Sequence, residues 1–212
     1  MIDTLIVLPT FNEGETINNI VASLKKYPVD ILVIDDCSTD KGCDKLEAIF
    51  LIKVIKNNKN LGYEKSLSKG LKFAIENKYK FLITFDSDGE HPPESIPAMI
   101  NLLNKDYLVV VGAREKRNRF SEDILHFLFK KIFYISDPLS GFKGYNLSKL
   151  KRKSIAISFQ SIGTKTLIKA IKNKLKICSF NIDNKKRSGD SRYGSGIILE
   201  IKILWTVLSE FF

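Results

Sequence analysis

Short apolar runs alternate with segments of helical periodicity along the first half of the chain, and this alternation constrains the fold more than any other feature. The runs predict strands at Thr4 to Leu8, Ile31 to Ile34, Ile52 to Ile55, Lys80 to Phe85 and Tyr107 to Val111. Helices are expected between them, near Glu15 to Lys26, Cys43 to Ile49, Glu64 to Asn77 and Glu94 to Asn104. Runs such as Ile31 to Ile34 are apolar on both faces, as strands are when helices cover both sides of a parallel sheet. The pattern therefore predicts an α/β fold with a mostly parallel sheet.

The second half of the chain has a less regular pattern. We expect a helix near Ser121 to Tyr134, an irregular turn at Asp137 to Gly144, a helix near Ile162 to Asn173, a strand at Leu175 to Ile182 and a polar loop at Asn184 to Gly196. A last amphipathic helix closes the chain, so we divide it into one α/β domain over residues 1–196 and an appended helix over 197–212. With 212 residues, 44% of them hydrophobic, the chain suits one compact domain of this kind.

Charge points to an anionic partner, because 34 Lys and Arg against 24 Asp and Glu give a net charge of +10. Nucleic acid, an anionic membrane surface and a phosphorylated small molecule all fit that charge. No basic motif interleaved with aromatic residues is present, so we do not expect nucleic acid to be the partner. The three cysteines form no C-x-x-C pair and are interpreted as reduced thiols of a cytosolic protein.

Polar residues that could bind a ligand or take part in catalysis follow four of the predicted strands. In an open α/β sheet, ligands bind in the crevice beyond the carboxyl ends of the strands. Asp35 and Asp36 follow the second strand, Asp86 and Asp88 the fourth, and Arg114 the fifth, so four carboxylates and an arginine should meet at one edge. The first strand is followed by Pro-Thr-Phe-Asn-Glu-Gly rather than G-x-G-x-x-G, and no G-x-x-x-x-G-K-[ST] occurs, which disfavours NAD enzymes and P-loop ATPases.

The acidic pairs each have a functional and a structural interpretation. Extended backbone would point Asp86 and Asp88 to the same side, where they could share Mg²⁺ or Mn²⁺ with substrate phosphate oxygens. D-x-D-G is equally a plain turn, because Asp and Gly are ordinary turn formers. Asp36 could accept hydrogen bonds from a ribose hydroxyl or a base N–H, or the pair at 35–36 could simply end its strand and lead into the next helix.

Six motifs taken together carry a resemblance to a known family. They are LPTFNEGETI at 8–17, VIDDCSTD at 33–40, N-L-G at 60–62, FDSDGEHPPE at 85–94, G-A-R at 112–114 and DPLSGF at 137–142. Their order and spacing over residues 3–192 resemble family 2 glycosyltransferases, most of all the polyprenyl-phosphate branch that includes dolichol-phosphate mannose synthases. The resemblance implies a GT-A fold, a nucleotide-diphosphate sugar as donor, inverting sugar transfer and a divalent metal, Mg²⁺ or Mn²⁺.

The resemblance also implies roles for individual residues. The nucleotide-sugar site would consist of Pro9, Asn12, Glu13, Asp36, Asn60, Gly62, Asp86, Ser87 and Asp88. The metal would be held by Asp86 and Asp88, with Glu90 as a third ligand. Around the diphosphate and the acceptor, the residues with catalytic roles would be Asp88, Arg114, Asp137, Arg187 and Arg192. The loop from Arg187 to Arg192 could instead be a solvated basic turn, and either Arg187 or Lys186 would take the role of the family's arginine in that loop.

The acceptor is the least determined element of the expected reaction. Transfer to a hydroxyl normally needs a general base, yet residues 159–166, where relatives often carry an acid, contain none. A phosphate monoester is already anionic at neutral pH and needs no base, so a polyprenyl phosphate fits both the missing base and the positive charge. If the acceptor is a saccharide hydroxyl, Asp137 is the candidate base. A member of the family that binds nucleotide without turnover is a further alternative.

The closing segment has a broad apolar face and a narrow polar stripe. Lys202, Thr206, Ser209 and Glu210 form the stripe, and Trp205 lies among the apolar residues. Such a face suits a membrane interface, the rest of the protein or a second copy of the chain. No signal peptide and no run of about 18 apolar residues is found. We therefore expect a cytoplasmic protein, peripheral at the inner face of the cell membrane, with self-association as the other use of this helix.

Overall fold

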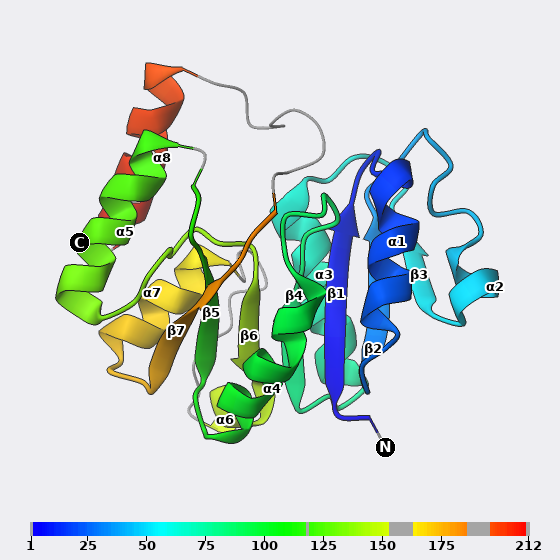
Figure 1. Ribbon diagram of the computed structural model, residues 1–212, viewed down its shortest axis with the longest axis horizontal. Helices are drawn as coiled ribbons and strands as arrows, with labels where there is room; N and C mark the ends of the chain where they lie inside the picture. The colour runs from blue at the N-terminus through cyan, green and yellow to red at the C-terminus, as the bar shows by residue number, and fades with distance from the viewer. Residues whose placement is uncertain (1, 118, 153–162, 186–195, 211–212) are drawn as a thin grey trace.

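A seven-stranded mixed sheet forms the centre of the computed structural model, which describes residues 2–117, 119–152, 163–185 and 196–210 (Figure 1). The strands are β1 (Thr4–Thr10), β2 (Asp30–Asp35), β3 (Lys53–Lys56), β4 (Phe81–Thr84), β5 (Val109–Arg114), β6 (Lys143–Asn146) and β7 (Ile177–Ile182). Their order across the sheet is β3-β2-β1-β4-β6-β5-β7. All neighbours pair in parallel except β6, which runs antiparallel to both β4 and β5. The predicted α/β class with a mostly parallel sheet is confirmed.

Helices cover both faces of this sheet. They are α1 (Gly14–Leu24), α2 (Leu46–Phe50), α3 (Tyr63–Glu76), α4 (Ile96–Asn104), α5 (Phe120–Phe133), α6 (Leu147–Arg152), α7 (Thr164–Lys172) and α8 (Ile197–Ser209), with a short 3-10 helix at Pro93–Ser95. Apolar side chains of α1, α2 and α4 pack on one face of the sheet, and those of α3, α6 and α7 on the other. The inner strand β1 is buried along its whole length, which explains why its sequence is apolar on both sides.

Close packing of α3 on β1 depends on one glycine. A Cβ atom added at Gly70 would lie 2.4 Å from a methyl group of Val7, so no larger residue fits there without displacing the Val7 side chain. The helix therefore approaches the sheet closely, and this fixes where its first turn, at Tyr63, meets the edge of the sheet.

The prediction of an irregular turn over Asp137 to Gly144 was wrong for its last two residues, 143 and 144. The strand β6 begins at Lys143 and pairs through four residues with β4 and, over three of them, with β5. The sequence K-G-Y-N has little intrinsic strand preference, since Gly and Asn are depleted in strands. Pairing on both sides, rather than propensity, makes this segment a strand, and the short helix α6 that follows it was not predicted either.

The closing helix α8 packs against α5 and α7, away from the sheet (Figure 1). Val207 is buried in a cluster with Leu125, Phe129 and Ile168, and Ile203 and Leu204 pack against that cluster. A carboxylate oxygen of Glu200 accepts a hydrogen bond of 2.7 Å from the backbone N–H of Ser121. One side of α8 is thus used within the molecule. Within the described residues, no helix is both long enough and apolar enough to cross a membrane.

Candidate active site

The polarity of the sheet brings the sequence motifs to one edge. The strands β1, β2, β4, β5 and β7 all run in the same direction, so the segments that follow them meet at the upper edge of the sheet in Figure 1. The antiparallel strand β6 starts at this same edge with Lys143. The predicted convergence of acidic residues and an arginine at the carboxyl ends of the strands is therefore confirmed for this edge of the sheet.

Asp36 joins the end of β2 to the start of α3. One oxygen, Oδ1, accepts hydrogen bonds from the Leu61 N–H at 2.8 Å and the Asn57 side chain at 2.7 Å. The other, Oδ2, accepts one from the Gly62 N–H at 2.7 Å, and Gly62 has a φ of 88° that favours glycine. Burial opposes ionisation, but these hydrogen bonds outweigh it and lower the pKa of Asp36. Near neutral pH the Asp36 carboxylate is therefore ionised, and the three hydrogen bonds hold it in place.

The loop after β1 docks on the loop after β2. The Asn12 N–H donates to Ser38 Oγ at 3.0 Å, and Asn12 Oδ1 accepts a hydrogen bond from the Thr39 N–H at 2.8 Å. The carbonyl of Pro9, near the end of β1, accepts a hydrogen bond of 2.9 Å from the Ser87 hydroxyl, which ties the end of this strand to the turn after β4. Three of the residues proposed for the donor site are thereby held on one rigid frame.

Two other predicted nucleotide contacts lie at the rim of this frame. Glu13 is half-buried, and its carbonyl accepts hydrogen bonds from the first turn of α1. Asn60 is exposed, next to the Leu61 and Gly62 amides that hold Asp36.

Asp88 lies in a turn and Asp86 directly before it, rather than both on a strand, so the expectation that extended backbone aligns them was wrong. The strand β4 ends at Thr84, and residues 87–88 form a turn. The Asp86 N–H donates to His91 Nδ1 at 3.1 Å, and Asp86 Oδ1 accepts a hydrogen bond of 2.8 Å from the Tyr63 hydroxyl. Asp88 Oδ1 accepts a hydrogen bond of 3.0 Å from the Glu90 N–H. The turn is held by its own side chains and by α3.

His91 and Gly141 enclose the Asp86 side chain. The imidazole of His91 is buried against the rings of Phe85 and Phe142, as expected for a structural histidine, and its Nε2 lies 3.6 Å from Asp86 Oδ2. A Cβ atom at Gly141 would lie 2.1 Å from the same carboxylate oxygen. Only glycine at 141 leaves room for Asp86 in this position.

The donor set of this turn fits a hard divalent cation. Mg²⁺ is usually held by one or two carboxylates and keeps water and phosphate oxygens in its other positions. Asp86 and Asp88 supply two carboxylates, and the Asp86 side chain is 22% exposed. No cluster of three or more His, Cys, Asp or Glu side chains suited to a metal ion occurs in the part of the chain that the structure describes. An ion here would therefore depend on substrate oxygens as well as on the protein.

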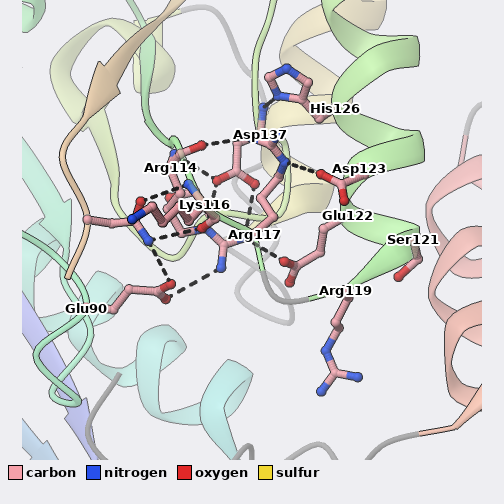
Figure 2. A network of polar contacts seen from close by, with 12 residues as sticks. Glu90, Arg114, Lys116, Arg117, Arg119, Ser121, Glu122, Asp123, His126 and Asp137 are labelled. Carbon is pink, nitrogen blue, oxygen red and sulfur yellow. Dashed lines mark hydrogen bonds and ion pairs between the residues drawn. The ribbon is translucent and has the colours of Figure 1, made fainter. Parts of the chain in front are cut away.

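Glu90, the predicted third metal ligand, is directed at Arg114 and Asn184 instead. Its Oε2 lies 3.5 Å from Arg114 Nη1 (Figure 2). Its Oε1 accepts a hydrogen bond of 3.2 Å from the Asn184 side chain. Burial raises the pKa of Glu90, and the cation of Arg114 offsets part of that effect.

Arg114 is the centre of a buried ionic network (Figure 2). Its Nε and Nη2 donate to the two oxygens of Asp137 at 2.7 and 3.1 Å, and its backbone N–H donates to Asp137 Oδ2 at 3.0 Å. Glu122 lies 3.4 Å from the same guanidinium. Burial raises the pKa of Asp137, but the hydrogen bonds and charge of Arg114 outweigh it, so that this pKa is lowered. Both groups are charged, and they form a bidentate pair.

This network bears on the base role considered for Asp137. The residue is fully buried, and both of its carboxylate oxygens are engaged by Arg114. A general base must be within reach of the acceptor hydroxyl, and a fully buried carboxylate paired with Arg114 is not accessible to one. Arg187 and Arg192, the other predicted cationic residues, lie outside the described residues.

Sequence reasoning missed three residues of this region. Asn184 donates from its side chain to Glu90 and to the carbonyl of Lys116, joining β7 to β5. Lys143 is fully buried, donates to the carbonyl of Ser140, and has its pKa lowered to about 8 mainly by burial. Tyr63 contacts Asp86. Asn184 follows β7 closely, so the strand-end rule could have found it, and Lys143 could have been found from its place directly after the DPLSGF motif at 137–142.

The fold and this edge define the class of the protein. A mostly parallel sheet with one antiparallel strand inserted, and acidic turns at its carboxyl edge, is the GT-A fold of nucleotide-diphospho-sugar transferases. The crystal structure of M. tuberculosis glucosyl-3-phosphoglycerate synthase is similar to it with a TM-score of 0.71, at 21% identity, over 98% of this chain and 80% of that one. This likeness establishes the fold.

The family follows from the sequence comparison. The model of Glycosyl transferase family 2 matches residues 5–172, and the chain belongs to that family. It is 28% identical to the UDP-N-acetylglucosamine–dolichyl-phosphate N-acetylglucosaminyltransferase of Methanococcus voltae, over 98% of this chain and 96% of that protein. It is 26% identical to the dolichol-phosphate mannosyltransferase of Pyrococcus furiosus over 65% of this chain, but spans only 44% of that protein's length.

Proposed function

We propose that this glycosyltransferase moves a sugar from a nucleotide-diphosphate sugar to a polyprenyl phosphate, with inversion at the sugar carbon and with Mg²⁺ or Mn²⁺. The observation that carries the proposal is the turn at Asp86 and Asp88, which lies at the ligand-binding edge of a GT-A sheet and is held by Tyr63 and His91. The relatives whose names include dolichyl or dolichol phosphate support the class of acceptor.

The donor would bind across the frame formed by the first, second and fourth strand ends. Its nucleoside end would contact Pro9, Asn12, Glu13, Asp36, Asn60, Gly62 and Ser87, and its diphosphate would reach Asp86 and Asp88. Asp36 would act chiefly by fixing the loop at 61–62, since its oxygens already accept three hydrogen bonds. The bound cation would supply neutralising charge for the departing diphosphate.

Catalysis would rest on positioning and electrostatics. The acceptor attacks from the side opposite the diphosphate, so the configuration inverts and no covalent enzyme intermediate forms. A phosphate acceptor needs no base, which agrees with the engagement of Asp137 by Arg114. Arg114, with Arg187 and Arg192, would set the positive field around the phosphates.

The test is a transfer assay with a panel of nucleotide sugars, Mn²⁺ and two acceptor classes, a short-chain polyprenyl phosphate and soluble saccharides. We expect a glycosylated product from the lipid phosphate, and loss of that product when EDTA removes the metal. A product only from saccharides would show that the acceptor is a saccharide hydroxyl rather than a lipid phosphate. Binding of a nucleotide sugar without any product would show a protein that binds the donor without catalysing transfer.

The outward face of α8 supports action at a membrane surface, the cytoplasmic face in this proposal. Exposed apolar side chains lie along it, with Ile198 at 85%, Ile201 at 60% and Trp205 at 73% exposed. Phe127 on the neighbouring helix α5 is 63% exposed and lies beside Lys131. Apolar side chains with nearby lysines favour an anionic lipid interface. The same face would serve a homo-oligomer if it paired with a second copy.

Replacing Ile201 and Trp205 together with serine is expected to weaken binding to vesicles of anionic lipid by about tenfold or more, because two large apolar side chains lose their burial. Co-sedimentation with the vesicles measures this loss of binding. Serine at Ile49 and Leu51 is the matched control, since these residues are 59% and 85% exposed at the α2 end of the molecule. Equal loss in both variants would refute the membrane face, and a change only in sedimentation coefficient would assign α8 to self-association.

A further inference from the structure

We propose that Tyr63 is a positioning residue, whose hydroxyl holds the Asp86 carboxylate in place for the divalent cation. This inference rests on the proposed function and adds a residue to its donor site. Tyr63 is the first residue of α3, immediately after the Asn-Leu-Gly motif.

The contact is a well-formed hydrogen bond between side chains of distant segments. The Tyr63 hydroxyl donates to Asp86 Oδ1 at 2.8 Å. Its ring is half-buried and packs against the apolar cluster that α3 forms with the sheet. Because the ring is anchored in the core, the hydroxyl has a defined position, and a carboxylate bound to it loses rotational freedom.

The residues beside Tyr63 hold the other acidic end of the donor site. The N–H groups of Leu61 and Gly62 donate to Asp36 at 2.8 and 2.7 Å. Three consecutive residues, 61–63, therefore contact both the acid proposed for the nucleoside end and the acid proposed for the metal. The separation of those two ends is set by this short segment at the start of α3.

A neutral donor suits this task better than a cation. A carboxylate oxygen has two lone pairs, so Oδ1 can accept the phenol proton and still face a metal ion. A lysine or arginine in its place would neutralise Asp86 and compete with the cation, as Arg114 neutralises Asp137 in the neighbouring network. The phenol orients the carboxylate and leaves its negative charge available.

Gly141 and His91 restrict the same carboxylate from other directions. A Cβ atom at Gly141 would lie 2.1 Å from Asp86 Oδ2, and His91 Nε2 lies 3.6 Å from the same oxygen. Among these three constraints, the Tyr63 hydroxyl can be removed without altering packing, by the substitution Tyr63→Phe. Loss of an outer group that orients a metal ligand typically weakens metal affinity about tenfold or more.

The experiment titrates Mn²⁺ into the protein in the presence of UDP and, separately, of GDP, and follows free Mn²⁺ by electron paramagnetic resonance. We expect Tyr63→Phe to weaken Mn²⁺ binding about tenfold or more, with an unchanged circular dichroism spectrum. Tyr79→Phe is the matched control. Its hydroxyl also donates to an aspartate at 2.8 Å, to Asp30 at the start of β2, the opposite edge of the sheet.

The results of the Mn²⁺ titration distinguish the role of Tyr63 from the proposed function. If the unmodified protein binds Mn²⁺ and Tyr63→Phe binds it equally well, or if Tyr79→Phe weakens binding as much, the role of Tyr63 is refuted and the proposed function stands. If the unmodified protein binds no Mn²⁺ with either nucleotide, both fail. In transfer assays, Tyr63→Phe should raise the Mn²⁺ concentration for half-maximal rate about tenfold, while its kcat at saturating Mn²⁺ stays within about twofold of the unmodified protein. A lower kcat with an unchanged Mn²⁺ dependence would also refute the role of Tyr63.

Discussion

Asp86→Asn is expected to reduce metal-dependent sugar transfer by about 100-fold or more, because it removes a negative charge from the proposed metal site and keeps the shape of the side chain. The amide oxygen can still accept the hydrogen bond from Tyr63 that Oδ1 accepts now at 2.8 Å. The loss should therefore come from metal binding rather than from unfolding. It should exceed the roughly tenfold effect typical of groups that only orient a ligand. Transfer rates over a range of Mn²⁺ concentrations measure it.

Asp44→Asn is the control for this prediction. Asp44 is an acidic side chain that is 50% exposed, with Lys56 at 4.0 Å, and it lies outside the proposed site. Its variant should keep the transfer rate within about twofold, as expected for a surface pair of little energetic weight. An Asp86→Asn variant with normal metal-dependent transfer would remove Asp86 from the site and with it the main support for the proposed function.

The sequence predicts the frame of this site well because the frame depends on local patterns. Buried strands of a parallel sheet are recognisable as short apolar runs, and their carboxyl ends meet at one edge whatever the details of packing. Asp36, Asp86 and Arg114 follow such runs, so their convergence is predictable from the order of residues along the chain. The four-residue strand β6 is different, because its pairing with β4 and β5 comes from residues distant in the sequence.

The partners of the charged side chains are less predictable than their positions. The place of Glu90 in its motif suggests a metal ligand, yet its carboxylate meets Arg114 at the end of β5 and Asn184 in the segment after β7. Asp137 is a candidate base by sequence, but its pairing with Arg114 over 23 positions is a property of the folded chain. A motif shows where an acid lies, whereas its charge environment depends on several elements at once.

The amphipathic pattern of α8 has the same limit. The pattern predicts a broad apolar face, and the structure divides that face in two. Val207 is buried against α5 and α7, while Trp205 on the same helix is 73% exposed. The helix thus packs against the rest of the molecule and also exposes an apolar surface. The predicted division of the chain after residue 196 therefore does not separate these two roles.

Asp137→Asn is expected to lower the free energy of unfolding by about 1.5–3 kcal/mol, because it removes the charge from a buried bidentate pair of hydrogen bonds with Arg114. Arg114 is 7% exposed and, among the described residues, would keep Glu90 and Glu122 at 3.5 and 3.4 Å. Asp123→Asn is the matched control. Asp123 also lies 2.7 Å from an arginine Nε, that of Arg117, but is 57% exposed, so its loss should cost less than about 1 kcal/mol. Urea unfolding of both variants measures the difference.

The stability difference between the unmodified protein and Asp137→Asn depends on pH because the pKa of Asp137 is lowered in the folded state. A carboxyl whose pKa is lower in the folded state contributes stability that is complete above its ordinary value of 3.8 and is lost as the pH falls through the folded value. The gap between the unmodified protein and Asp137→Asn should therefore be constant near neutral pH and narrow only below about pH 4.

The same variant separates the two roles considered for Asp137. If Asp137 positions Arg114, activity and stability fall together, and the activity loss is the same at every pH where the protein is folded. If it were the general base for a hydroxyl acceptor, kcat would fall while the urea midpoint stayed near that of Asp123→Asn. A stable, inactive Asp137→Asn protein would thus contradict the ion-pair role and favour a saccharide acceptor, because only a hydroxyl needs that base.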